Sequence, residues 1–190
     1  MNVCVYCGSR SGNDPRFEQA AIDVGASIAR RGWGLIYGGG NIGLMGSVAR
    51  TALAHGAHVT GIIPTFLATK EIALQDCSEL IEVESMHIRK QLMIDRSDIL
   101  VALPGGFGTL DELFEALTWR QIRLHARPIG LLNIAGYYNP LLTMIERMRS
   151  DGFVQDRHAS MLWVSDSVEA LFDELAGTTT SQFGDHLDLA

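Results

Sequence analysis

Two segments of the chain carry residue types and spacings that could bind an anion or take part in catalysis. The segment MHIRK, residues 86–90, places Arg89 and Lys90 side by side in a chain that has only two lysines. With helical spacing, Met93 and Arg96 share one face with these cations. Such a face is either solvated, which is the ordinary case, or held in a pocket where its cations meet an anion.

The second segment is PGGFGTLDE, residues 104–112, which follows the apolar run ILVAL at residues 99–103. From Leu110 onward, apolar residues recur at i, i+3, i+4 and i+7, which predicts an amphipathic helix. A glycine-rich turn between a strand and a helix leaves free N–H groups at the positive end of the helix dipole. Such a turn attracts anions, phosphate above all. No Lys-Ser or Lys-Thr pair follows the glycines, so this is not a Walker A loop.

Glu112 admits two interpretations. Thr109 and Glu112 fit a capping box, with Thr109 at the N-cap and Glu112 three residues later, and this structural role alone explains both. Glu112 would also lie one turn, about 5 Å, from the expected phosphate site, where a carboxylate could reach a ribose attached to that phosphate. The residues alone leave both interpretations open.

Another glycine-rich loop, YGGGNIGLMG at residues 37–46, contains G-x-G-x-x-G at Gly38, Gly40 and Gly43. The motif follows the second expected strand rather than the first. No Asp or Glu stands near residues 61–64 to bind a ribose hydroxyl, so a dinucleotide site is not favoured. The glycines either let a ligand approach the backbone or allow close packing in the turn.

Short β-like runs alternate with helical patterns along the chain, as in parallel sheets covered by helices. We therefore predict an α/β fold: a single-domain, Rossmann-like parallel sheet with helices on both faces. Strands are expected at residues 2–6, 33–37, 58–63, 80–83, 99–103, 128–132 and 162–164. Helices are expected at residues 15–31, 44–55, 86–97, 110–123, 140–150 and 167–175. The domain is expected to span residues 1–176, with a mobile polar tail at 177–190.

Composition excludes several classes of protein. The formal charge is −7, from 15 basic and 22 acidic residues, and no basic run is present, so a nucleic-acid surface is not expected. The chain shows no signal-peptide pattern and no apolar stretch long enough to cross a bilayer, so we expect a cytoplasmic protein without a membrane partner. Cys4 and Cys7 form C-x-x-C on a strand and are expected to be buried hydrophobes. No metal-ligand spacing is found.

The MHIRK and PGGFGTLDE segments together resemble the LOG family, the cytokinin riboside 5′-monophosphate phosphoribohydrolases, whose paired motifs are M-H-x-R-K and P-G-G-x-G-T-x-x-E. The resemblance covers nearly the whole chain except the tail. It implies that Arg89 and Glu112 are the catalytic pair. It also implies a set of substrate-binding residues: Glu71, Lys90, Gly105, Gly106, Phe107, Gly108, Thr109, Leu110, Asp111 and Thr118.

This resemblance implies hydrolysis of the N-glycosidic bond of adenosine 5′-monophosphates, N6-modified or not, to free base and ribose 5-phosphate. It implies a homodimer and no cofactor, and it leaves open whether Arg89 acts on the phosphate or on the leaving base. The alternative is a nucleotide or molybdenum-cofactor carrier without turnover, since related Rossmann-like proteins bind that cofactor intact. A lysine decarboxylase would need pyridoxal phosphate on Lys70 or Lys90.

Overall fold

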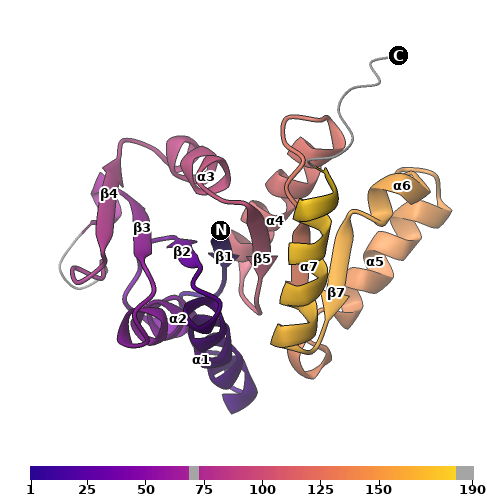
Figure 1. Cartoon of the computed structure of the whole chain (residues 1–190). Helices are drawn as coiled ribbons and strands as arrows, with labels where there is room; N and C mark the ends of the chain where they lie inside the picture. Colours follow the sequence, from indigo (N-terminus) through magenta and orange to yellow (C-terminus); the bar gives the residue numbers. More distant parts are fainter. Residues whose placement is uncertain (69–72, 183–190) are drawn as a thin grey trace.

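The computed structural model describes residues 1–68 and 73–182, which form one parallel sheet with helices on both faces (Figure 1). The order across the sheet is β4-β3-β2-β1-β5-β6-β7, and every neighbouring pair is parallel. The strands are β1 (Asn2–Tyr6), β2 (Gly34–Tyr37), β3 (Val59–Pro64), β4 (Glu79–Val83), β5 (Ile99–Ala102), β6 (Ile129–Leu132) and β7 (Leu162–Ser165). The predicted Rossmann-like α/β fold is confirmed, and the strand ends differ from prediction by no more than one residue.

Seven α-helices lie within the described residues: α1 (Pro15–Arg30), α2 (Gly43–Ala54), α3 (Met86–Asp95), α4 (Phe107–Gln121), α5 (Asn139–Ser150), α6 (Asp156–Ala159) and α7 (Val168–Gln182). Two short 3-10 segments, η1 (Thr65–Leu67) and η2 (Ile134–Gly136), and helix α6 were not predicted. Helix α7 continues past the expected end at 175 and enters the stretch predicted to be a mobile tail. The rest of that tail lies outside the described residues.

Alternate side chains of the central strand enter two separate cores, as expected when both sheet faces are covered. Val3 and Val5 pack with α1, α2 and α7, whereas Cys4 and Tyr6 pack with α3, α4 and α5. Cys7 belongs to the first core and Cys4 to the second, and burial raises the pKa of both thiols. The prediction that these cysteines are buried hydrophobes is confirmed.

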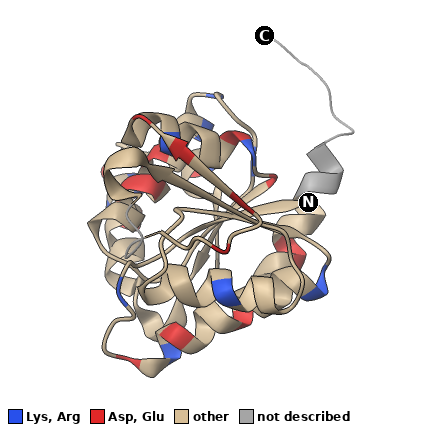
Figure 2. Cartoon of the chain, turned by 90° about the vertical axis from the view of Figure 1, so that its left-hand side faces the viewer, with Lys and Arg blue, Asp and Glu red and all other residues tan. Residues whose placement is uncertain are grey.

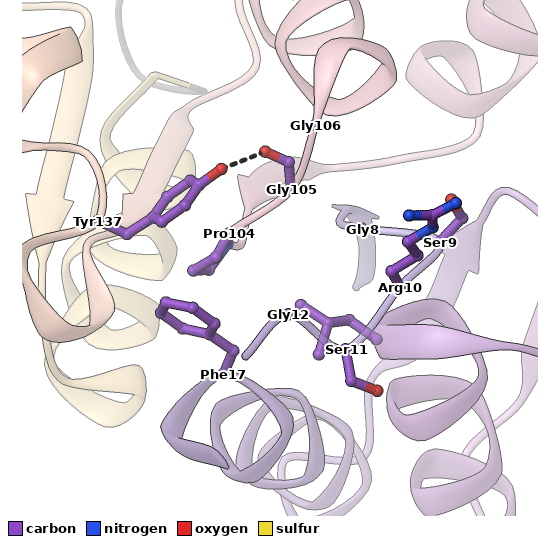
Figure 3. A pocket seen from close by; sticks show the side chains of 11 residues that line it. Gly8, Ser9, Arg10, Ser11, Gly12, Phe17, Pro104, Gly105, Gly106 and Tyr137 are labelled. Carbon is purple, nitrogen blue, oxygen red and sulfur yellow. Dashed lines mark hydrogen bonds between the residues drawn. The ribbon is translucent and has the colours of Figure 1, made fainter. Parts of the chain in front are cut away.

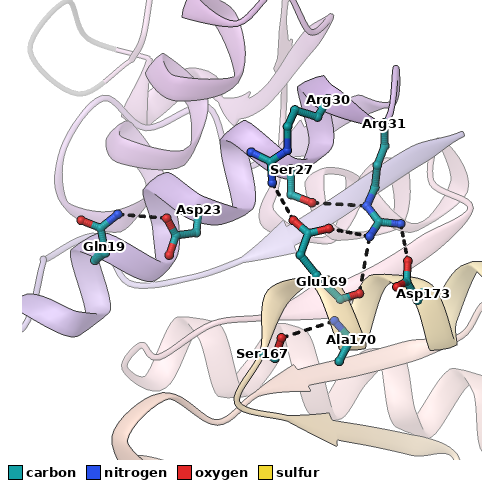
Figure 4. Close-up of polar contacts among 9 residues, drawn as sticks. All are labelled: Gln19, Asp23, Ser27, Arg30, Arg31, Ser167, Glu169, Ala170 and Asp173. Carbon is teal, nitrogen blue, oxygen red and sulfur yellow. Dashed lines mark hydrogen bonds and ion pairs between the residues drawn. The ribbon is translucent and has the colours of Figure 1, made fainter.

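Ion pairs connect helix α7 to the C-terminal end of α1 (Figure 4). Arg31 pairs with Glu169 at 2.6 Å and with Asp173 at 2.8 Å, and its guanidinium lies 5.1 Å from the ring centroid of Trp33. Elsewhere, Figure 2 shows Lys and Arg interspersed with Asp and Glu. Ion pairs between solvent-exposed side chains contribute little to the free energy of unfolding, about 0–1 kcal/mol each.

The strand order reverses beside β1, because β2 lies on one side of it and β5 on the other. The loop after β1 leads to α1 on one face of the sheet, and the loop after β5 leads to α4 on the opposite face. The two loops meet where the amide of Gly8 donates to the carbonyl of Pro104 at 3.1 Å. Open parallel sheets bind ligands in the crevice at such a switch point.

Two neighbouring tyrosines hold the loop between β5 and α4. Tyr138 is buried and its hydroxyl donates to the carbonyl of Leu103 at 2.6 Å. The hydroxyl of Tyr137, which is 43% exposed, donates to the carbonyl of Gly105 at 2.7 Å. The backbone of this glycine-rich loop is therefore fixed by side chains from the segment between β6 and α5.

We predict that Tyr138→Phe lowers the free energy of unfolding by about 1–3 kcal/mol, because it leaves a buried carbonyl without its donor. Tyr137→Phe is the matched control and should cost less, since water can replace its exposed hydroxyl. Urea unfolding followed by circular dichroism measures both. Equal losses for the two variants would contradict this account of the loop.

Candidate active site

The structure brings Arg89 of α3 and Glu112 of α4 together in a buried ion pair. Arg89 Nη1 donates to Glu112 Oε1 at 2.8 Å, and the two residues are only 8% and 7% exposed. Arg89 Nε also donates to the carbonyl of Ile62 at 3.1 Å, and Nη2 lies 3.5 Å from the carbonyl of Gly38. The guanidinium is thus held at the carboxyl ends of β2 and β3, and it orients the carboxylate.

The local environment disfavours the charge of Glu112. Burial raises its pKa above the ordinary 4.5, and the attraction of Arg89 only partly opposes this effect. Among the described residues, Oε1 accepts the bond from Arg89 and Oε2 accepts none. A carboxylate in this state can accept a proton or stabilise a nearby positive charge more readily than a solvated one.

The capping-box prediction for Thr109 and Glu112 is wrong. Helix α4 begins at Phe107 with Gly106 at the N-cap, so Thr109 is its third residue and Glu112 its sixth. Thr109 is buried and packs against Gly105, where an added Cβ would lie 2.1 Å from Oγ1. The structural explanation of Glu112 as a cap is therefore removed, and its contact is with Arg89.

Lys90 is also buried, so the solvated-face interpretation of the two cations is wrong. Its ammonium lies 3.0 Å from Asp111 Oδ2 and 3.1 Å from Glu115 Oε1. Although burial lowers the pKa of Lys90, the two carboxylates raise it by more. This cluster ties α3 to α4 beside the Arg89–Glu112 pair. Glu115 was missed by sequence reasoning, although it lies one turn beyond Asp111 on the predicted helix.

The start of α4 is open. No side chain caps the helix, and its first turn contains no acidic residue. A Cβ built on Gly106 or Gly108 would meet no atom within 4 Å. Free N–H groups at such a start favour an anion. By contrast, Gly105 is required by close packing against Gly8 and Thr109.

A cavity of about 250 Å³ lies at the switch point between β1 and β5 (Figure 3). Gly105 and Gly106 line it on the α4 side. Phe17 and Tyr137 lie on one side of the cavity and meet edge to face at 5.4 Å between ring centroids. The segment 9–11 lies on the other side (Figure 3).

A second hollow of about 560 Å³ follows the outer face of α4. Four predicted substrate-binding residues line it: Phe107, Leu110, Asp111 and Thr118. Its remaining walls are Phe114, Glu115 and Trp119. Three features therefore adjoin α4: the buried ion pair on its inner side, the cavity at its start and this groove along its outer face. Glu71 lies outside the described residues.

The glycines of the 37–46 loop accommodate protein atoms. A Cβ on Gly38 would lie 1.9 Å from Arg89 Nη2, and one on Gly43, whose φ is +60°, would meet the backbone of Ser9 and Arg10 at 2.4 Å. Close packing, rather than approach of a ligand, explains these two positions. The absence of a side chain at Gly38 thus leaves room for the guanidinium that contacts Glu112.

In residues 1–68 and 73–182, no group of three or more His, Cys, Asp or Glu is arranged to hold a metal ion. No helix in that part of the chain is long and apolar enough to cross a membrane.

Known proteins resemble this chain over most of its length. Residues 45–175 match a family model described as "possible lysine decarboxylase". A cytokinin riboside 5′-monophosphate phosphoribohydrolase of Arabidopsis thaliana is 48% identical over 153 residues, covering 80% of this chain and 67% of that protein. A second from the same plant is 42% identical over 173 residues, covering 91% and 81%.

Among solved structures, the molybdenum cofactor binding protein of Rippkaea orientalis superposes with a TM-score of 0.71. The match covers 93% of this chain and 96% of that one, at 22% identity, and this likeness shows the fold alone. The sequence matches are far closer and extend across both motifs. The chain belongs to the LOG family, the family of the cytokinin riboside 5′-monophosphate phosphoribohydrolases.

Proposed function

We propose that the chain hydrolyses the N-glycosidic bond of adenosine 5′-monophosphates, with or without an N6 substituent, to free base and ribose 5-phosphate. The observation that carries this proposal is the buried Glu112 carboxylate, held by Arg89 and lying five residues, about 7.5 Å by helix rise, from Phe107 at the open start of α4. The names of the relatives in this family support the same reaction.

Glycosidic cleavage passes through a ribose with oxocarbenium character, so the enzyme has to stabilise positive charge on the sugar. In the proposed mechanism, the Glu112 carboxylate supplies the opposing negative charge, and Oε2 orients the attacking water or takes a proton from it. The free N–H groups at the start of α4 hold the phosphate, whose binding energy places the ribose against the carboxylate. The water oxygen becomes the anomeric hydroxyl, and the proton that the water gives up balances the proton with which the base leaves. This chemistry needs neither a metal nor an organic cofactor.

For Arg89, the contacts favour a positioning role. Three of its nitrogens face Glu112 and two main-chain carbonyls, so the guanidinium fixes the carboxylate rather than standing free to bind phosphate. Lys90 is likewise engaged by two carboxylates that keep it charged. An amine in that state is a poor nucleophile for pyridoxal phosphate, which argues against the decarboxylase label at this residue.

A homodimer is proposed as well. Large apolar side chains are exposed near both ends of α4: Phe107 is 94% exposed, Ile122 59% and Leu124 64%. Exposed apolar side chains that gather on a surface mark sites of interaction, including subunit interfaces. The resemblance to the LOG family likewise implies a homodimer.

The test of the function is release of free base from AMP and from N6-isopentenyl-AMP, followed by chromatography. Glu112→Gln should lower the rate by about 10²- to 10⁴-fold, because the amide can neither carry the charge nor accept a proton. Glu146→Gln on the exposed face of α5 is the matched control and should keep the full rate. Nucleotide recovered intact from the wild-type protein, although bound, would favour the carrier alternative.

The rate should also depend on pH in a defined direction. Only ionised Glu112 stabilises the cationic sugar, and burial raises its pKa, so kcat/KM should fall as the pH drops toward a midpoint above 4.5. A pH profile with AMP measures this midpoint. An acidic limb with its midpoint at or below 4.5, or one that persists unchanged in the residual rate of Glu112→Gln, would assign the limb to another group.

A further inference from the structure

The cavity at the switch point is lined by one arginine side chain, which takes no part in the proposed mechanism. Arg10 lines it together with Ser9 and Ser11, on the side facing Phe17 and Tyr137 (Figure 3). Its lining includes no Asp or Glu, whereas the groove along α4 is lined by Asp111 and Glu115. In a chain of net charge −7, this hollow therefore favours an anion and the groove does not.

Arg10 is unpaired within the described part of the chain. No hydrogen bond or ion pair engages its guanidinium there, whereas Arg16, on the same loop-to-helix segment, binds the carboxylate of Asp14 through three contacts of 2.6–3.0 Å. Arginine is suited to phosphate because its planar guanidinium can bind two oxygens at once. An arginine without a carboxylate partner beside a hollow is therefore available to a ligand.

The backbone holds this segment in place across from α4. Gly8 donates to Pro104 and accepts from the amide of Met45 at 3.3 Å, so the start of the loop is tied to both neighbouring loops. Gly12 has φ of +75°, and a Cβ there would lie 2.8 Å from the ring of Phe17. The loop is thus anchored at both ends, with Arg10 between the anchors.

We propose that Arg10 binds the 5′-phosphate of the substrate in this cavity and selects nucleoside monophosphates over nucleosides, an inference that rests on the proposed function. The phosphate lies between Arg10 and the open start of α4, with the hydroxyl of Ser9 as a further donor. Phe17 and Tyr137 provide an apolar wall for the sugar. The ribose then extends along the first turns of α4 toward Glu112.

Binding of ribose 5-phosphate, measured by calorimetry, tests Arg10 without any turnover. Arg10→Met should weaken binding about ten- to a hundredfold, the usual worth of a hydrogen bond to a charged group. Arg10→Lys should restore part of this loss, and Arg16→Met should bind like the wild type. Unchanged binding in Arg10→Met, equal weakening in Arg16→Met, or no binding to the wild-type protein would overturn the proposal.

Turnover gives a second readout. Arg10→Met should lower kcat/KM for AMP by the same factor and leave that for adenosine unchanged, so that the preference for the monophosphate shrinks. An equal loss on both substrates would indicate a structural role and overturn the selection of phosphate. If no protein, wild type included, releases base, the proposed hydrolase fails, and binding of ribose 5-phosphate still decides the role of Arg10.

Discussion

The contact on which the site depends is the buried ion pair between Arg89 and Glu112. Two charges withdrawn from water are tolerated only when they are paired and their remaining donors are satisfied. Here the pairing draws on four elements, because the arginine comes from α3, the carboxylate from α4, and the extra acceptors from the ends of β2 and β3. Removing one partner alone would leave an unpaired buried charge, which typically costs about 3–5 kcal/mol. The same packing that stabilises the pair holds a carboxylate of raised pKa in the first half of α4.

The surrounding structure keeps that geometry fixed while leaving the helix start open. The Lys90 cluster ties α3 to α4, and the two tyrosines hold the carbonyls of the loop before α4. Glycine is needed at Gly38 for the guanidinium and at Gly105 for Thr109, whereas Gly106 and Gly108 face open space. Within the 104–112 segment, Gly105 therefore allows close packing, whereas Gly106 and Gly108 leave the helix start open. The two hollows also differ in charge. No acidic residue lines the cavity at the helix start, whereas acidic residues line the outer groove of α4.

Most of the fold could be predicted from the sequence, because strands buried on both faces give short apolar runs that are hard to mistake. The helix starts were less predictable. Thr109 and Glu112 satisfy a capping pattern, but α4 begins earlier, with Gly106 at its N-cap. Thr109 therefore lies within the helix, where its side chain is buried. Paired motifs indicated Arg89 and Glu112. The roles of Arg10, Glu115 and Tyr138 were not predictable, since they depend on contacts between segments far apart in the chain.

The most direct measurement is a crystal structure of the Glu112→Gln variant with AMP bound. The proposed mechanism predicts the phosphate at the start of α4, within hydrogen-bond distance of the amides of residues 107–109, and the anomeric carbon in contact with residue 112. A nucleotide lying wholly in the groove along the outer face of α4, with its ribose remote from residue 112, would contradict the assignment of Glu112 as the catalytic carboxylate.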